Sequence, residues 1–573
     1  MMKPVRLPAS ATLALPRWAI FALCLLYILP GLLGRDPWKN DDAASFGIMW
    51  TMAHDSFAGW LTPNIAGLPM PDEGPLAFWL GALAIKCLGP LLGDVMAARM
   101  AGILAFLLGA TSIWYSAYLL GRRTEAQPLK LAFGGQPNAR DYGRTLADAA
   151  LLIYLGCWGL LLNSHQTSAE ALQVALVAFS LYRILRYLDK PHPVRAITLG
   201  LTLAALTLTR GWWPPLVLWL MALACLWLPG MQRTRGLLHM LITLATVLAI
   251  ILGWHAIGDS GNLQAWRDWN FAQVDSPNGA GVKFLLRYGI WFYWPAWPFA
   301  AWAVYAWRRQ RYALHIAFPV ACLVGLLGLT LISPNPAESV LLPLMPPLVI
   351  LAAFGLPTMK RSAINAVDWF AVMAVTAGAA LIWLAWFAHL YGWPAQLAKN
   401  TLKLAPGFKP EFHAFAFIIA TLASIGWIAL IYWRISRQPS VLWRAVVLSS
   451  GGLVLCWLLL MTLFLPWADY RLSYAPVARQ IAERLPAKTD CIVTNVSPAQ
   501  RASFAYFGKL PFAPVVNGQL PHCRILLLQD HVKLRDETEI AKEFRSKHWQ
   551  LLWEGRRAAD RDERFRLYRR SDE

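Results

Sequence analysis

Apolar runs of about 20 residues recur along nearly the whole chain, and each is long enough to cross a hydrocarbon core of roughly 30 Å. Of the 573 residues, 57% are hydrophobic, and a soluble protein could not bury that many apolar runs. The sequence therefore predicts an α-helical polytopic membrane protein. We expect about 13 transmembrane helices, near residues 17–34, 95–120, 145–163, 169–187, 194–209, 212–228, 236–256, 289–307, 313–332, 339–357, 367–390, 412–433 and 444–465.

The net charge of +20 would by itself suggest a nucleic-acid partner, but its distribution excludes that class. Lys and Arg collect in short loops between the apolar runs, as they do in cytoplasmic loops of membrane proteins. Loop 121–144 is such a loop, so an even number of crossings must precede it if the N-terminus is cytoplasmic. We therefore interpret the first apolar run as a retained helix, and residues 76–92 as an interfacial helix on the outer face.

These assignments divide the chain into two parts. Residues 1–465 form the transmembrane domain, whose first outer loop, 35–94, is rich in acidic residues, and residues 466–573 follow the last span on the outer face. Alternating helix-like and strand-like stretches in 466–573 predict a small α/β domain. Cys491 and Cys523 lie in this domain, where an oxidising compartment would favour a disulfide. Two buried free thiols are the alternative.

Carboxylates near the membrane boundary are the main candidates for function. Asp41 and Asp42 follow the first span, Glu73 lies later in the same loop, and Glu170 begins the span after "LNSHQTSA". A carboxylate at such a boundary is costly unless it is paired or has a functional role. For Asp41, capping of the following "AASFGIMWTMA" helix is the alternative interpretation.

Three stretches carry a family resemblance through their order and shared side of the membrane: "KNDDAASFGIMWTM", "NIAGLPMPDEGPLAFWLGAL" and "LLNSHQTSAEALQVALVAF". Two later stretches, "LTLTRGWWP" and "LISPNPAESVLLPLMPPLVILAA", extend it. The chain resembles the GT-C glycosyltransferases that use polyprenyl-phosphate sugars, and among them the lipid A aminoarabinose transferases and protein mannosyltransferases. The resemblance covers roughly residues 17–360, with an outer C-terminal domain of the kind found in the aminoarabinose transferases.

The resemblance implies roles for individual residues. Asp41 corresponds to the catalytic aspartate, Asp42 to its acidic neighbour, Glu170 to the second acidic position, Glu73 to the glutamate of a Glu-Lys-Pro-Pro motif, and Arg210 to a lysine of the later turn. We therefore expect Asp41, Asp42 and Glu170 to be catalytic and Glu73 and Arg210 to bind substrate. The chain departs from the family pattern where Gly74 and Ala44 replace basic residues, and where only Asn335 and Glu338 stand near an expected lysine.

Because a lipid phosphate needs cations, other basic residues must compensate for these departures. The outer loop 257–288 contains Arg267, Lys283 and Arg287, and we predict that all three bind substrate, Arg287 foremost. Alternatively, they are interfacial anchors within an aromatic belt.

The resemblance implies an inverting glycosyltransferase of the bacterial inner membrane, with its active site and C-terminal domain on the periplasmic face. The donor would be a sugar on undecaprenyl or another polyprenyl phosphate, and the acceptor lipid A, lipopolysaccharide or another glycolipid. A protein O-mannosyltransferase is the alternative within the class, and a lipid or solute transporter or flippase the alternative outside it. No cofactor is required by the motifs and no metal ligands are assigned, although a divalent metal ion stays open because some relatives use one.

Overall fold

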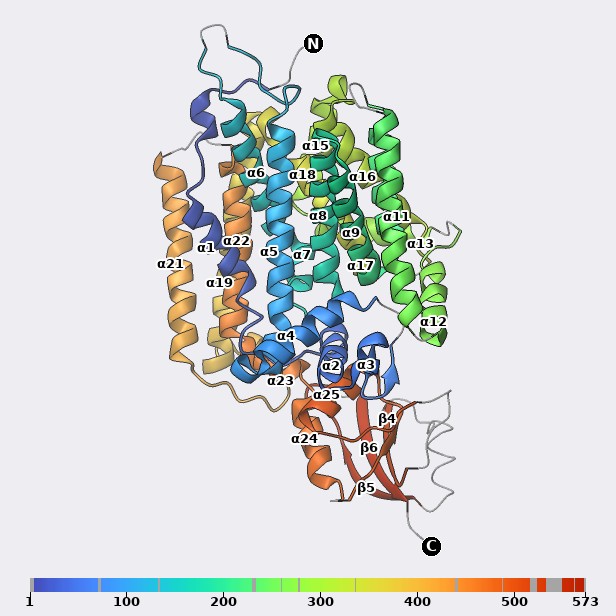
Figure 1. Ribbon diagram of the computed structural model, residues 1–573. Helices are drawn as coiled ribbons and strands as arrows, with labels where there is room; N and C mark the ends of the chain where they lie inside the picture. The colour runs from blue at the N-terminus through green and yellow to red at the C-terminus, as the bar shows by residue number, and fades with distance from the viewer. Residues whose placement is uncertain are drawn as a thin grey trace.

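The computed structural model is a bundle of long helices that carries a small domain at one end (Figure 1). The structure describes residues 5–70, 74–131, 134–228, 233–258, 260–276, 279–334, 336–437, 442–486, 488–515, 523–531, 549–560 and 562–570. The chain is a helical polytopic membrane protein, as the apolar runs predict. Each of those runs is helical along at least part of its length.

The bundle consists of helices packed side by side, of which the longest run between its two ends (Figure 1). They are α1 (Arg17–Ile28), α5 (Asp94–Gly121), α6 (Ala139–Leu155), α8 (Ala169–Asp189), α9 (Pro193–Arg210), α10 (Trp213–Cys225), α11 (Arg233–Ile257), α15 (Ala296–Ala306), α16 (Leu314–Leu331), α18 (Met345–Ala353), α19 (Arg361–Tyr391), α21 (Ala414–Arg437) and α22 (Arg444–Leu463). Within the described parts of the chain, eight helical segments are long and apolar enough to cross a membrane unaided. The other helices of the bundle are shorter or less apolar. Several apolar runs are also divided by breaks.

Those breaks have local causes. The run 145–163 divides at Gly156 and Cys157 into α6 and α7 (Trp158–Asn163), and the run 339–357 divides at prolines, which have no N–H to donate. The resulting short helices are α17 (Glu338–Leu341), η4 (Leu342–Leu344) and η5 (Leu356–Thr358) around α18. The remaining short elements of the bundle are η1 (Ala9–Thr12), α12 (Ser260–Ala272), α13 (Ala280–Phe284), the π-helical turn η2 (Leu285–Gly289), α14 (Ile290–Phe292), η3 (Arg308–Gln310) and α20 (Ala395–Leu404).

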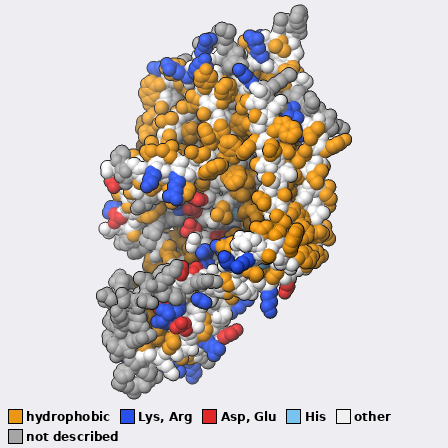
Figure 2. Space-filling view, turned by 180° about the vertical axis from the view of Figure 1, so that it is seen from behind, with side chains coloured by type: hydrophobic (Ala, Val, Ile, Leu, Met, Phe, Trp, Pro, Cys, Tyr) orange, Lys and Arg blue, Asp and Glu red, His pale blue; other side chains and the backbone are white. Residues whose placement is uncertain are grey.

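The first outer loop forms a layer between the bundle and the small domain. It contains α2 (Asp41–His54), α3 (Phe57–Leu61), a two-stranded hairpin of β1 (Asn64–Ile65) and β2 (Leu68–Pro69), and α4 (Leu76–Leu92). Figure 1 shows α4 lying across the end of the bundle, the arrangement expected of an interfacial helix. Figure 2 shows hydrophobic side chains covering the bundle, with Lys and Arg gathered at the end away from the small domain.

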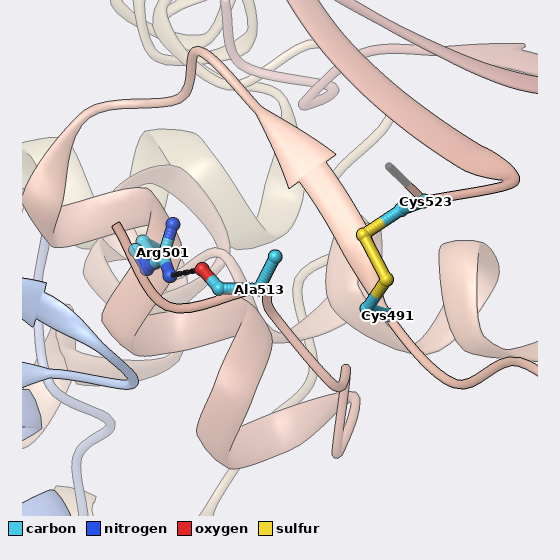
Figure 3. Close-up of a disulfide and its surroundings, with 4 residues drawn as sticks. All are labelled: Cys491, Arg501, Ala513 and Cys523. Atoms are coloured by element: carbon cyan, nitrogen blue, oxygen red, sulfur yellow. Dashed lines mark hydrogen bonds between the residues drawn. A yellow bond between two sulfur atoms is a disulfide. The ribbon is translucent and has the colours of Figure 1, made fainter. Parts of the chain in front are cut away.

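The small C-terminal domain combines helices with one mixed sheet. It follows α23 (Leu465–Leu472) and contains α24 (Ala475–Arg484), β3 (Ile492–Thr494), α25 (Pro498–Phe507), β4 (Ile525–His531), β5 (Trp549–Gly555) and β6 (Glu563–Arg570). The strand order is β3-β4-β6-β5, with β3 and β4 parallel and the other pairs antiparallel. Cys491 and Cys523 form a disulfide beside β3 and β4 (Figure 3), so the alternative of two free thiols is wrong.

The C-terminal domain is held to the first outer loop by Arg501 of α25. Its guanidinium is buried and donates hydrogen bonds to the carbonyl oxygens of Ile65 (3.0 Å), Ala66 (2.6 Å) and Ala513 (2.7 Å), the last of which is shown in Figure 3. One cation thereby joins the tip of the β1–β2 hairpin to the C-terminal domain. Because α25 also packs along α2, the domain contacts the helix that begins with the candidate catalytic aspartate.

Candidate active site

Asp41 is the first residue of α2. Asn40, at the N-cap position, has φ 71°, a left-handed conformation that Asn adopts more readily than most residues. Asn40 occupies the N-cap position, although its side chain makes no capping hydrogen bond, and Asp41 is the first helical residue rather than the cap that the alternative proposed. Exposed carboxylates in a first helical turn are favoured by the helix dipole, so this position suits an ionised, solvent-accessible group.

Asp42, the next residue, points the other way into a buried ion-pair network. One of its oxygens lies 2.8 Å from Arg35 Nη1 and also accepts the backbone N–H of Trp38 at 2.8 Å, while the other accepts the N–H of Thr167 at 2.6 Å. Arg99 lies 4.0 Å away. Burial alone would raise the pKa of Asp42, but the two arginines and two N–H donors outweigh it and hold that pKa below its usual value.

This network fastens three segments to one another. Arg35 also donates to carbonyl oxygens of Gly31 and His165, and Arg99 donates to the carbonyl oxygen of Leu32 at 2.8 Å. The end of the first span, the start of α2 and the loop before Glu170 are thus held together around one carboxylate. Asp42 is only 1% exposed, which favours a positioning role over the direct catalytic role expected from the sequence.

Glu170 and Arg210 form the second charged pair of the site. Glu170 lies in the first turn of α8, Arg210 is the last residue of α9, and Arg210 Nη1 lies 3.1 Å from Glu170 Oε1. Removal from water and the charge of Glu170 raise the pKa of Asp41, Arg210 lowers it, and Asp42 adds a smaller upward contribution. Asp41, Glu170 and Arg210 are therefore close enough for their charges to interact.

The turn after Arg210 is fixed by a contact with α12. Gly211 has φ +82°, and a Cβ there would lie 2.0 Å from the Oδ1 of Asn270. Asn270 accepts the N–H of Trp212 through the same oxygen at 3.1 Å, and its carbonyl oxygen accepts the indole N–H of Trp213 at 2.7 Å. Glycine is needed at this turn both for its conformation and for this close approach.

A pocket of about 70 Å³ opens beside Arg210. It is lined by polar and aromatic side chains that the sequence interpretation did not single out, namely Gln173, Trp213, Trp269, Gln273, Ser333 and Ser339. Gln173 Oε1 is buried and has no hydrogen-bond partner among the described residues. The sequence could have indicated Gln173 as a site residue, because it lies one turn after Glu170 in α8 and residues three apart share a helix face.

The cations predicted in loop 257–288 are not part of this pocket. Arg267 is exposed and lies 3.8 Å from Asp268, Lys283 is exposed on α13, and Arg287 is exposed on η2 with its guanidinium 5.3 Å from the ring centre of Tyr288. Their roles in binding stay predictions. Glu73 and Asn335 lie outside the described residues, and Glu338 accepts a hydrogen bond from Asn163 at 3.2 Å.

Gly74, which replaces a basic residue of the family motif, is packed against the end of α9. A Cβ at this position would lie 2.0 Å from the carbonyl oxygen of Leu208. No residue with a side chain fits there without displacing the backbone. The cation nearest along α9 is Arg210, two residues beyond this contact.

The described residues contain no group of three or more His, Cys, Asp or Glu side chains arranged to hold a metal ion.

No family model and no curated protein sequence matches this chain. Among solved structures, ArnT from Cupriavidus metallidurans bound to undecaprenyl phosphate aligns with a TM-score of 0.66 over 96% of this chain and 97% of that chain, at 16% sequence identity. The chain has the ArnT fold. The apo form of that ArnT aligns with a TM-score of 0.64 over the same shares.

The match confirms the GT-C fold that the order of the motifs implied, including its C-terminal domain. The archaeal oligosaccharyltransferase AglB from Archaeoglobus fulgidus shows a weaker likeness, with a TM-score of 0.45, 10% identity and 85% of this chain covered.

Proposed function

We propose that this protein is an inverting glycosyltransferase that moves a sugar from undecaprenyl or another polyprenyl phosphate to an acceptor at the periplasmic face of the bacterial inner membrane. The acceptor is lipid A, lipopolysaccharide or another glycolipid. The observation that carries the proposal is the convergence of Asp41, Glu170 and Arg210, from three separate segments, beside an aromatic pocket. The ArnT fold supports it, because the solved relative binds undecaprenyl phosphate.

The reaction replaces one bond at the anomeric carbon of the sugar. An acceptor oxygen forms the new bond on one face while the bond to the polyprenyl phosphate oxygen breaks on the other, which inverts the configuration. The departing phosphate keeps the electron pair, and a cation such as Arg210 stabilises its negative charge. No covalent enzyme intermediate is needed.

Asp41 has one of two tasks, depending on the acceptor. If the acceptor is a hydroxyl group, the Asp41 carboxylate accepts its proton as the bond forms. If the acceptor is a phosphate, which is largely ionised near neutral pH, Asp41 orients the reactants and stabilises positive charge on the sugar. The raised pKa of Asp41 increases its affinity for a proton, which favours the first task.

Arg210 provides the positive charge near the lipid phosphate that the family motif would place at position 74, where this chain has glycine. The backbone contact between Gly74 and Leu208 excludes a lysine side chain from the motif position, while Arg210 lies at the pocket wall. Its pairing with Glu170 orients the guanidinium, and a planar guanidinium can donate two parallel hydrogen bonds to a phosphate.

The test compares strains that lack the gene and are complemented with wild type, Asp41→Asn or Asp55→Asn. Asp55 is an exposed carboxylate at the other end of α2, so Asp55→Asn is the matched control. Mass spectrometry of lipid A, other glycolipids and polyprenyl-phosphate sugars should show one glycan mass missing and its lipid-linked donor accumulating only in Asp41→Asn. Loss of a protein-bound mannose instead would identify the protein O-mannosyltransferase. If all glycans are unchanged in Asp41→Asn, a transporter or flippase replaces the transferase as the leading function.

A further inference from the structure

Three arginines converge where α8 turns into α9. Arg195 Nη1 donates hydrogen bonds to the carbonyl oxygens of Arg186 (2.7 Å) and Lys190 (3.0 Å), which fastens the start of α9 to the end of α8. Arg183, one turn before Arg186, donates to the hydroxyl group of Thr198 in α9. All three arginine side chains are partly exposed, so a ligand can reach them.

This cluster lies far from the candidate active site. Glu170 begins α8 and Arg210 ends α9, and these two residues meet at the site. The turn between the two helices is therefore at the opposite end of the bundle, away from the C-terminal domain (Figure 1).

The positive charge of the cluster is not neutralised by the protein. Arg186 and Arg195 are both close enough to Arg183 for their charges to oppose its own. Asp189, the next carboxylate along the chain, lies 4.0 Å from Arg123 instead. Within the described parts of the chain, none of the three arginines of the cluster forms an ion pair.

Other arginines between helices of this bundle do have a carboxylate partner. Arg434 of α21 and Arg444 of α22 lie 2.7 and 3.7 Å from Asp368 of α19. Arg210 is paired with Glu170 in the same way. The cluster at the α8–α9 turn lacks such an anion, and a bound ligand can supply it.

The three side chains also have hydrogen-bond donors to spare. A guanidinium carries several N–H groups in a planar fork. In Arg183, Arg186 and Arg195, hydrogen bonds among the described residues occupy a single terminal nitrogen each, which in Arg186 donates to the hydroxyl oxygen of Tyr182 at 3.1 Å. The other N–H groups can donate in parallel pairs to phosphate oxygens.

We propose that this arginine cluster binds the phosphate group of an anionic lipid headgroup. The negative charge of the phosphate offsets the repulsion between the arginines, and its oxygens accept from their unused N–H groups. Basic pockets between transmembrane helices suit anionic lipid headgroups for these reasons. The site is separate from the proposed transfer reaction and faces the other leaflet of the membrane.

The surroundings of the cluster favour a lipid over a soluble phosphate. Val194, Ile197 and Leu201 are exposed at spacings that place them on one face of α9, at the end where the arginines lie. Tyr182 packs against the exposed Tyr115 of α5, with 5.9 Å between ring centres. Tyrosines of this kind mark the level of lipid headgroups. A phosphate bound at the arginines would leave its acyl chains beside the apolar face of α9.

The test is native mass spectrometry of the full-length protein in detergent micelles, titrated with phosphatidylglycerol or with phosphatidylcholine of the same acyl chains. We expect wild type to bind phosphatidylglycerol about 10-fold more tightly. Arg183→Gln and Arg186→Gln should each weaken phosphatidylglycerol binding about 3- to 10-fold and leave phosphatidylcholine binding unchanged. Arg140→Gln, which removes an exposed arginine of loop 121–144 outside the cluster, should bind both lipids as wild type does.

A second measurement holds even if the variants are less stable. Added phosphatidylglycerol should raise the unfolding temperature of wild type but not that of the double variant Arg183→Gln, Arg186→Gln, each protein being compared with its own lipid-free sample. Equal binding of the two lipids to wild type would overturn the proposal, as would unchanged phosphatidylglycerol affinity in the double variant.

Further arms separate the sources of the phosphate and the two proposals. If glycerol 3-phosphate binds wild type as tightly as phosphatidylglycerol does, the ligand is a soluble phosphate and the lipid assignment is wrong. Asp41→Asn should bind phosphatidylglycerol as wild type does, because Asp41 is at the other end of the bundle. A failed transfer reaction therefore does not alter this result.

Discussion

Gly47 of α2 and Ala502 of α25 touch so closely that a Cβ on Gly47 would lie 2.3 Å from the Cβ of Ala502. Tyr506, one turn further along α25, packs edge-on against Phe46 at 4.9 Å and Trp50 at 5.7 Å between ring centres. The C-terminal domain therefore sets the position of the helix that begins with Asp41.

Enlarging the small residue on α25 should impair transfer. Ala502→Leu forces α2 and α25 apart, and a displacement of about 1 Å at reacting groups can reduce a rate about 100-fold. We expect at least a 10-fold loss of transfer in a reconstituted assay, with normal membrane insertion. Ala395→Leu, at an exposed site on α20, is the matched control. Full activity in Ala502→Leu would show that the domain contact does not position α2.

The pH dependence of transfer should follow the charges around Asp41. Because Asp41 acts in its ionised form and its pKa is raised, activity should fall on acidification at a higher pH than for an ordinary aspartate. Glu170→Gln removes a negative charge and should move this acidic limb to lower pH, whereas Arg210→Gln removes a positive charge and should move it to higher pH. Rate profiles of the three proteins from pH 4 to 8 test this. Shifts in the same direction for both variants would contradict it.

Asp42 should be needed for stability more than for chemistry. Asp42→Asn keeps the side-chain shape but leaves Arg35 and Arg99 buried near each other without their shared carboxylate, and breaking a buried pair typically costs about 3–5 kcal/mol. Thermal unfolding of the purified protein should occur several degrees lower. Asp55→Asn should leave it unchanged. An unaltered unfolding temperature combined with lost transfer would instead restore a direct catalytic role for Asp42.

Gly74 should tolerate no side chain. In Gly74→Ala the new methyl group would overlap the carbonyl oxygen of Leu208, so the loop or the end of α9 must move, and Arg210 with it. We expect a loss of transfer of at least 10-fold, because the cation is displaced from the pocket. Gly253→Ala, on α11 where nothing lies within 4 Å of the new methyl group, provides the control. Equal activity of the two variants would disprove the steric argument.

The bundle could be predicted from the sequence because its signal is local. Every long apolar run is helical along at least part of its length, since backbone groups in lipid must satisfy their hydrogen bonds within the segment. The charge of loop 121–144 predicted an interfacial helix at residues 76–92, and the structure has the helix α4 there, lying across the end of the bundle. The breaks around α7 and α18 were less evident, because a hydrophobicity window averages over single glycines and prolines.

The candidate site was only partly predictable. Asp41, Glu170 and Arg210 carried motif signals, and the structure brings them together. The different roles of Asp41 and Asp42 did not follow from the sequence, because adjacent residues of a helix point in different directions and only Arg35 and Thr167 reveal which one is buried. Gln173, Trp269 and the other pocket residues come from helices whose packing the sequence does not specify.

The sequence alone determined that the chain spans a membrane, which loops carry positive charge and which carboxylates lie near the boundary. These properties depend on hydrophobicity and charge along short stretches. Tertiary structure decided which charges are paired, where lysine is sterically excluded, and how α25 holds α2. Those properties arise from contacts between segments hundreds of residues apart, and such contacts are set by the packing of whole helices.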